Sequence, residues 1–522
     1  MSQTEFTKVI ETGYTFKGLS FFLGAAKLDA KTIPSTKINI PLATMNRHGL
    51  IAGATGTGKT KTLQVITEAL SKNGVPTLVM DIKGDLSGVS QPGVMNEKVA
   101  ARMKELGVDW APSQLPAEFL SLNSSAVKVR STLQEFGPVL LSKLMDLSDV
   151  QASVLGLIFK YCEDKNIALL DFADFKKVLQ YYATDEGKQD LGAEYGMVAG
   201  TSIGAITRKI IELEQQGVEE LFGEPAFDVQ DLMRTTSDGK GYINILRLMD
   251  LQSKPQLFAT FMLSLINKVY AHFPEVGDIA KPKLCLFIDE AHLIFANADN
   301  ALISQIETTI KLIRSKGVGV FFITQNPSDI PSSVLSQLGL KIQHSLRAFT
   351  AIDRKAIDTA SKNYPESEYY KTEQLLTELG IGEALVTCLS EQGTPTPLAH
   401  VIVTPPTTRM DVVTDQEVQS NLNSSMLYPK YKEDIHRESA ADILGAKITD
   451  SQAKKAAEVQ AAADAKATIQ KAKEQAAADK LAKAEGTTFD KVSKNPFVKA
   501  LQATFIRKII AEIMKSVMGG RK

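Results

Sequence analysis

The chain has 522 residues, of which 44% are hydrophobic and 23% charged, which excludes a wholly disordered or collagen-like chain. Lys and Arg number 59 against 60 Asp and Glu, so bulk charge neither favours nor excludes a polyanionic partner. Three scattered cysteines (Cys162, Cys285 and Cys388) exclude a disulfide scaffold and a zinc ribbon, and they fit a reducing, cytoplasmic location. The chain has no signal-peptide pattern and no run of 18 apolar residues, so we expect no transmembrane segment.

The first 47 residues are short mixed segments, which we expect to pack on a larger core. After them, short apolar runs alternate with helical patterns, and several runs are nearly continuous in Val, Ile, Leu and Phe. Such runs are typical of strands buried on both faces of a parallel sheet. The runs cover residues 48–53, 75–81, 241–248, 283–290, 317–325, 340–346 and 383–389. They predict an α/β core with a mainly parallel sheet over 48–129 and 236–405.

The first of these runs leads into a phosphate-binding loop. The motif GxxxxGK[ST] is matched in full by Gly53, Ala54, Thr55, Gly56, Thr57, Gly58, Lys59 and Thr60. Glycines let backbone N–H groups point at a phosphate, and the following helix adds its positive N-terminus. Lys59 can reach the β- and γ-phosphates, and the Thr60 hydroxyl can bind Mg²⁺. Strand, loop and helix follow in the order that the motif needs, so we predict that ATP and Mg²⁺ bind here.

Residues 130–235 predict an all-helical subdomain inserted between the second and third core strands. Ser148 and Gln151 form a capping-box pattern, and Ser202 and Gly217 mark the start and end of a further helix. Apolar residues recur at helical spacing as Val150, Val154 and Ile158, as Phe172, Phe175, Leu179 and Tyr182, and as Ile203, Ile206, Ile210 and Leu213.

An apolar run further along the chain ends in two acids, Asp289 and Glu290. Adjacent carboxylates at the end of a buried strand are costly unless a cation or a reaction uses them. We expect Asp289 to hold Mg²⁺ and Glu290 to act as the general base for the water that attacks the γ-phosphate. The pair therefore favours hydrolysis over nucleotide binding alone.

Three more side chains are candidates for nucleotide contacts. Gln325 ends the next buried run and could sense the γ-phosphate, or it could simply cap the strand. Arg314 and Arg47 precede the strands that lead to Gln325 and to the phosphate loop, and either could offset phosphate charge or be a surface arginine. If Arg314 acts on a neighbouring subunit, the protein must form a ring.

The C-terminal part changes character after a Pro-rich exit near residue 405. We expect a polar linker over 406–450 and an exposed single helix or weak coiled coil over 451–485, where 14 of 35 residues are alanine. In 486–522, apolar residues recur every four positions among basic ones, which predicts a basic amphipathic helix. This helix could pack on its own protein or a neighbouring subunit, bind a partner, or contact nucleic acid or a membrane surface. Residues 451–522 hold 15 basic and 7 acidic residues, so the rest of the chain is acidic.

Several segments together resemble the bacterial HerA-like ATPases of the HerA/FtsK superfamily. They read NRHGLIAGATGTGKT, MDIKGDLSG, FIDEAHLIF, IRSKGVGVFFITQNPSDIP and LKIQHSLRAFT. The resemblance implies a RecA-like P-loop core, a homo-hexameric ring, ATP hydrolysis and DNA translocation. The resemblance implies that the phosphate-loop residues, the two acids, Gln325 and the two arginines have the roles given above. It also implies that Asp81 lies near the site. In HerA a β-barrel domain precedes the core, but 47 residues are too few for it, so we do not expect nuclease docking through that domain.

Three functions remain open at this stage. A ring-shaped DNA translocase or helicase is the first, with pore contacts from loops 83–88 and 326–333, where Lys83 is the one cation. An ATPase that remodels or moves protein is the second. A nucleotide-gated scaffold that docks through its tail is the third, and the Asp289–Glu290 pair argues against it because a gate does not need the second acid.

Overall fold

The fold comes from a computed structural model that describes residues 3–488 and 508, except 124, 197, 278, 297–299 and 349. The chain divides into two units, Met1–Leu444 and Gly445–Lys522, and each is taken by itself below.

The strands of the first unit form one sheet. In the part of the chain that the structure describes, twelve strands pair in the order β2-β1-β12-β11-β10-β3-β9-β8-β4-β7-β5-β6. Their bounds are β1 Ser20–Leu28, β2 Lys31–Pro41, β3 Gly49–Ala52, β4 Thr77–Asp81, β5 Ala117–Ser121, β6 Val127–Lys128, β7 Ile243–Arg247, β8 Leu284–Ile288, β9 Val318–Thr324, β10 Leu340–Gln343, β11 Glu383–Thr387 and β12 Ala399–Val403. All pairings from β10 to β6 are parallel, and those from β2 to β10 are antiparallel.

Six of the seven apolar runs that were predicted to be buried strands lie in the parallel block, as β3, β4, β7, β8, β9 and β10, whereas the run 383–389 forms the antiparallel β11. Every residue of β3, β4, β8 and β9 is buried, as the absence of alternation in their sequences predicts. Strand β9 lies between β3 and β8, so one strand separates the phosphate loop from the two acids.

The first 47 residues contribute two strands to this sheet. Strands β1 and β2 pair with each other, and β1 pairs with β12, so the segment extends the antiparallel side of the sheet. The helix α1 (Gln3–Gly13) buries Phe6 and Ile10. The segment is therefore part of the core sheet and not only a segment packed on it.

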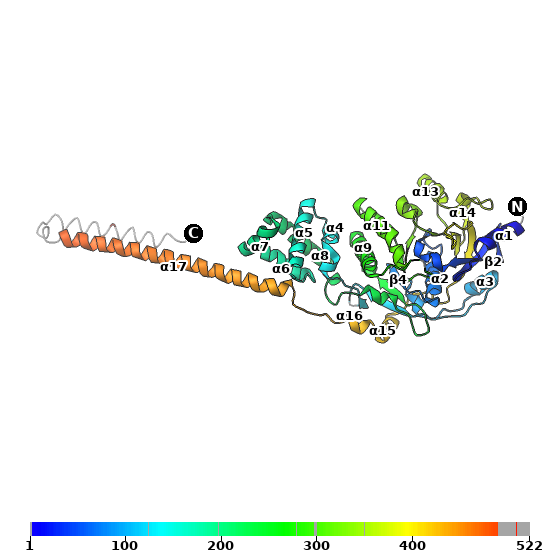
Figure 1. The fold of residues 1–522 in the computed structure, drawn as a ribbon, viewed down its shortest axis with the longest axis horizontal. Helices are drawn as coiled ribbons and strands as arrows, with labels where there is room; N and C mark the ends of the chain where they lie inside the picture. The colour runs from blue at the N-terminus through cyan, green and yellow to red at the C-terminus, as the bar shows by residue number, and fades with distance from the viewer. Residues whose placement is uncertain are drawn as a thin grey trace. The chain divides into compact units, whose positions relative to one another are not determined.

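Helices cover the sheet and connect its strands (Figure 1). In the core they are α2 Lys59–Lys72, α3 Glu97–Leu106, α9 Pro255–His272, α10 His292–Phe295, α11 Asn300–Ile313, α12 Ser332–Leu335, α13 Ala351–Ser361 and α14 Thr372–Glu378. Short 3₁₀ helices η1 (Leu42–Arg47) and η6 (Arg314–Lys316) precede β3 and β9.

In the described part of the segment between β6 and β7, five α-helices form a bundle, which Figure 1 shows in cyan and green. They are α4 Leu133–Leu144, α5 Asp149–Asp164, α6 Phe172–Ala183, α7 Asp185–Tyr195 and α8 Gly200–Gln215. The capping box of Ser148 and Gln151 is formed at the start of α5. Helix α8 begins two residues before Ser202, and Val150 is exposed, unlike the rest of its predicted stripe.

Residues 406–413, which the sequence analysis placed in a polar linker, are bound along α2. The carboxylate of Glu68 accepts hydrogen bonds from the backbone N–H groups and hydroxyls of Thr407 and Thr408, at 2.6–2.9 Å. Gln64 donates to the Thr408 hydroxyl and to the carbonyl of Arg409. We call residues 406–413 the strap. After it come α15 (Asp415–Ser424) and α16 (Tyr428–Tyr431), so the predicted linker is largely ordered.

The last described helix, α17, runs over Ala440–Thr488 and begins eleven residues before its predicted start at 451. All side chains described over 452–481 are exposed. The predicted basic helix over 486–522 lies outside the described residues, apart from 486–488 and 508. Among the described residues, no helix is long and apolar enough to span a membrane.

Candidate active site

The phosphate loop joins β3 to α2 and has the backbone geometry of an anion cradle. Gly56 and Gly58 have φ angles of 81° and 114°, which a residue with a Cβ rarely adopts. Gly58 is also the N-cap of α2, and a Cβ there would lie 3.0 Å from the backbone nitrogen of Gly382. The first N–H groups of α2 have no partner within the helix and face the same end. The loop is therefore built to receive a negatively charged group.

Lys59 lies over this loop. Its Nζ donates to the carbonyl oxygens of Gly53 at 2.5 Å and Ala54 at 3.1 Å. Burial, together with the nearby charge of Lys83, lowers the pKa of Lys59. Lys59 thus places a cation at the loop, which favours a phosphate group as the ligand.

The two acids reach the same edge of the sheet. Ile288 pairs with Phe322 of β9, and Thr324 pairs with Ala52 at the end of β3, so the residues after these strands lie at one level. Burial and the charge of Glu290 raise the pKa of Asp289 to about 7. A divalent cation beside Asp289 would reverse this shift because it favours the ionised carboxylate.

Glu290 is held in an unusual conformation. Its φ angle is 47°, a region that costs a non-glycine residue on the order of 1–3 kcal/mol and that is enriched at active sites. Its carboxylate is ion-paired with Lys83, and His292 Nδ1 lies 3.2 Å from its second oxygen. Burial opposes ionisation, but Lys83, His292 and a hydrogen bond with Gln325 together lower the pKa of Glu290. Glu290 is therefore ionised and able to accept a hydrogen bond from water.

A loop after β4 brings two more charged side chains to the site. Asp81 ends β4, and its carboxylate accepts hydrogen bonds from the backbone N–H groups of Gly84 at 2.7 Å and Leu86 at 3.2 Å. Burial and the nearby Asp85 raise the pKa of Asp81 to about 6. Asp85, from the same loop, accepts a hydrogen bond from the Thr60 hydroxyl at 3.1 Å. Asp81 thus holds the backbone of this loop through two hydrogen bonds, and Asp85 of the same loop contacts Thr60.

The groups around Thr60 fit a magnesium ion. The hydroxyl of Thr60 and the carboxylates of Asp85 and Asp289 are hard oxygen ligands. Oδ1 of Asp85 is buried and has no hydrogen-bond partner, as a ligand oxygen or the acceptor for a metal-bound water would be. Among the described residues, no group of three or more His, Cys, Asp or Glu side chains could hold a metal on its own. A cation here would need the nucleotide's oxygens as further ligands.

Arg47 and Arg314 do not lie at this edge. They end η1 and begin η6, just before β3 and β9, which run parallel. Arg314 lies near His48. Burial of His48, together with the positive charge of Arg314, lowers the pKa of His48 to about 4. Strand β3 alone separates this opposite edge from the phosphate loop by about 13 Å. The geometry therefore contradicts the expectation that these arginines lie next to phosphates bound in the same chain.

Three charged residues of the site were not predicted from the sequence to lie at the nucleotide. Lys83 was assigned to a pore contact, but it pairs with Glu290. Asp85 contacts Thr60, and Nη2 of the exposed Arg347 donates to the carbonyl of Thr55 in the phosphate loop at 3.2 Å. All three follow the carboxyl ends of parallel strands, β4 and β10, where sites of α/β proteins gather, and that position is the signal that could have found them.

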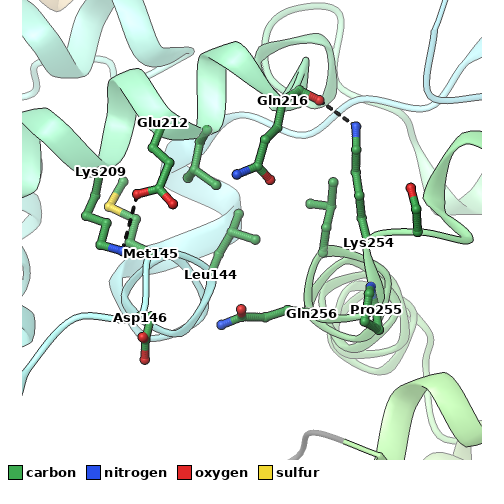
Figure 2. Close-up of a pocket in the computed structure, with 12 residues that line it drawn as sticks. Leu144, Met145, Asp146, Lys209, Glu212, Gln216, Lys254, Pro255 and Gln256 are labelled. Atoms are coloured by element: carbon green, nitrogen blue, oxygen red, sulfur yellow. Dashed lines mark hydrogen bonds and ion pairs between the residues drawn. The ribbon is translucent and has the colours of Figure 1, made fainter.

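A separate cavity of about 550 Å³ lies between the helical bundle and the start of α9 (Figure 2). It is polar: Lys209 is ion-paired with Glu212 at 3.3 Å, and Lys254 donates to the carbonyl of Gln216 at 2.5 Å. None of its lining residues belongs to the predicted nucleotide site. Its cations are engaged by the protein, so the cavity does not compete with the phosphate loop as a site for ATP.

Comparison with known families agrees with this geometry. The sequence model of the family described as "Helicase HerA-like C-terminal" matches residues 26–522. The chain belongs to this family. Membership confirms the resemblance, the P-loop fold class and the class of enzyme, an ATPase of helicase type.

Individual relatives are distant. A probable helicase of Methanocaldococcus jannaschii is 24% identical over 68% of this chain and 66% of its own length. The DNA double-strand break repair helicase HerA of Sulfolobus acidocaldarius is 20% identical over 70% of this chain and 67% of its own length. The chain thus spans about two thirds of these relatives. A solved bacterial conjugative coupling protein, TrwBdeltaN70, is 13% identical and covers 78% of this chain and 94% of its own, with a TM-score of 0.49, too low to add to the family match.

Proposed function

We propose that this chain is an ATP-driven ring motor of the cytoplasm that translocates or unwinds DNA. The observation that carries the proposal is the convergence of Lys59, Thr60, Asp289, Glu290 and Gln325 at one edge of the sheet, in a member of a helicase family. The names of its relatives, a probable helicase and a DNA double-strand break repair helicase, favour DNA as the polymer.

The side chains divide the work of hydrolysis. Lys59 and the loop N–H groups bind the β- and γ-phosphates, and Thr60 and Asp289 would hold Mg²⁺. The cation would neutralise charge on the phosphates. Glu290 orients the attacking water and accepts its proton, while Gln325 beside it reports whether the γ-phosphate is present.

The two arginines fit a ring better than a monomer. Arg47 and Arg314 lie at the edge of the sheet opposite to their own phosphate loop, so they can reach a nucleotide only if that edge faces the site of a neighbouring subunit. A homo-hexamer would bring one subunit's arginines to the next subunit's γ-phosphate, where such side chains accelerate hydrolysis strongly.

The moved polymer is identified by stimulation of the ATPase. The full chain is assayed alone and with double-stranded DNA, single-stranded DNA or RNA over a range of salt. We expect DNA to stimulate hydrolysis, and the stimulation to fall with salt because phosphate contacts release counterions. If no nucleic acid stimulates hydrolysis at any salt concentration, the DNA assignment is wrong and a protein substrate becomes the better proposal.

A further inference from the structure

We propose that Lys83 is a positioning residue for hydrolysis, which fixes the carboxylate of Glu290, and that it is not a contact for the moved polymer. The inference rests on the proposed role of Glu290 as the general base. Its basis is the ion pair between Lys83 Nζ and Oε1 of Glu290. The two side chains are 37% and 7% exposed, so a half-buried cation is committed to an almost fully buried acid.

The pair fixes the plane of the carboxylate. Lys83 binds Oε1 of Glu290, while Oε2 is buried and has no hydrogen-bond partner, with His292 Nδ1 3.2 Å away. Oε2 therefore keeps its lone pairs to accept a hydrogen bond from water, while Oε1 is held by Lys83. General-base catalysis needs this combination of a fixed direction and a free lone pair.

The fold supplies Lys83 in register. Strands β4 and β8 are neighbours, and Met80 pairs with Ile288, so the loops after the two strands start side by side. Asp81 is 0% exposed, and its carboxylate binds the N–H groups of Gly84 and Leu86. Lys83 lies between Asp81 and Gly84, whose backbone N–H the Asp81 carboxylate holds. Its backbone is thus fixed by a buried side chain, as a positioning role requires.

A contact with the polymer would break this arrangement. To bind a phosphate of DNA, Lys83 must release Glu290 and leave an almost fully buried carboxylate without its strongest partner. Burial opposes the positive charge of Lys83, but Glu290, Asp289 and Asp85 outweigh burial and raise its pKa, so Lys83 balances part of the negative charge of these three carboxylates. Transfer of Lys83 to a polymer would disturb that balance in each catalytic cycle.

The test is a double-mutant cycle on the full chain. Lys83→Met and Lys83→Arg are made with the native Glu290 and with Glu290→Gln, and kcat and KM for ATP are measured with and without double-stranded DNA. We expect Lys83→Met to lower kcat about tenfold or more in both conditions, with KM and DNA affinity changed less than about threefold. Lys83→Arg retains a cation and should recover most of kcat. Lys160→Met, which removes an exposed lysine paired with Asp164, is the matched control and should change nothing.

The cycle separates the outcomes. In the Glu290→Gln background, Lys83→Met should change the residual rate by less than about twofold, because the carboxylate that it positions is gone. Full additivity of the two losses would overturn the inference. So would a Lys83→Met variant that keeps its DNA-free kcat and loses DNA affinity. If Lys83→Met does not fold, Lys83→Gln takes its place with the same expectations. A native rate in Glu290→Gln alone would instead contradict the proposed function.

Discussion

The contact between the strap and α2 can be tested by changing Glu68, without any nucleotide present. Glu68 on α2 is 4% exposed and its carboxylate accepts four hydrogen bonds from Thr407 and Thr408. Glu68→Gln keeps the size of the side chain but replaces one oxygen, which accepts two of these bonds, by an N–H₂ group that can only donate. The backbone N–H that this oxygen accepted then faces a donor in a buried place, and the neighbouring hydroxyl can keep a hydrogen bond only by accepting one from the new N–H₂ group.

The free-energy cost of Glu68→Gln can be worked from the cost of leaving buried hydrogen-bonding groups without partners. A buried polar group without its partner costs about 1–3 kcal/mol. The lost bond to the backbone N–H and the changed bond to the hydroxyl share one site, so their costs do not simply add. We therefore expect Glu68→Gln to lower the free energy of local opening of the strap by about 3 kcal/mol. At 1.36 kcal/mol for each factor of ten, this is on the order of a hundredfold.

Hydrogen exchange measures this opening directly. Peptides that cover residues 404–413 should exchange their amides on the order of a hundredfold faster in Glu68→Gln than in the native chain. Glu163→Gln is the control, because Glu163 is 67% exposed in its pair with Lys160, and it should change exchange nowhere outside α5. Unchanged protection of Thr407 and Thr408 in Glu68→Gln would show that the Glu68 carboxylate does not hold the strap on α2.

Three further predictions address the ring, the bundle and acid stability. A mixture of Arg314→Ala and Glu290→Gln subunits should recover ATPase activity that neither variant has alone, because some interfaces then combine a native arginine with a native base; no recovery would contradict action between subunits. Phe175→Ala, at a fully buried position of the bundle, should lower the free energy of unfolding by about 3–5 kcal/mol in denaturant titrations, against less than about 0.5 kcal/mol for the exposed Val150→Ala. The depressed pKa of His48, about 4 against an ordinary 6.5, means that the unfolded chain binds the extra proton first as pH falls, so stability is lost from about pH 6.5 down to 4. His48→Gln should therefore show a smaller loss of unfolding free energy between pH 7 and 5 than the native chain, and an equal loss would contradict the assignment.

Parallel strands with unbroken apolar runs, such as β8 and β9, could be predicted from the sequence because both of their faces are buried. The parallel strand β5 was not predicted, because its sequence AEFLS carries the buried Glu118 among few apolar residues. Strands β1 and β2 escaped prediction because they lie on the antiparallel side, where polar residues interrupt the apolar ones, as the sequence KTIPSTKINIP of β2 shows. Strand β6 has two residues, too few for any periodic signal. The strap carries no local signal either, because its order comes from the side chains of α2.

In the candidate site, too, some residues could be predicted from the sequence and others could not. The phosphate loop and the two acids are contiguous motifs, so their residues could be named from spacing alone. The pairing of Lys83 with Glu290 joins two loops more than 200 residues apart and needs the strand order to be known. The position of Arg47 and Arg314 also depends on strand direction, which is why closeness in sequence to β3 and β9 suggested a contact that the fold does not make within one chain.

Hydrolysis of ATP with Glu290 as general base at the phosphate loop is measured by the single-turnover rate of Glu290→Gln with saturating ATP, Mg²⁺ and double-stranded DNA. We expect the variant to bind ATP as tightly as the native chain and to hydrolyse it at least about a hundredfold more slowly. Hydrolysis at the native rate by a variant that binds ATP normally would contradict the role of Glu290 as general base.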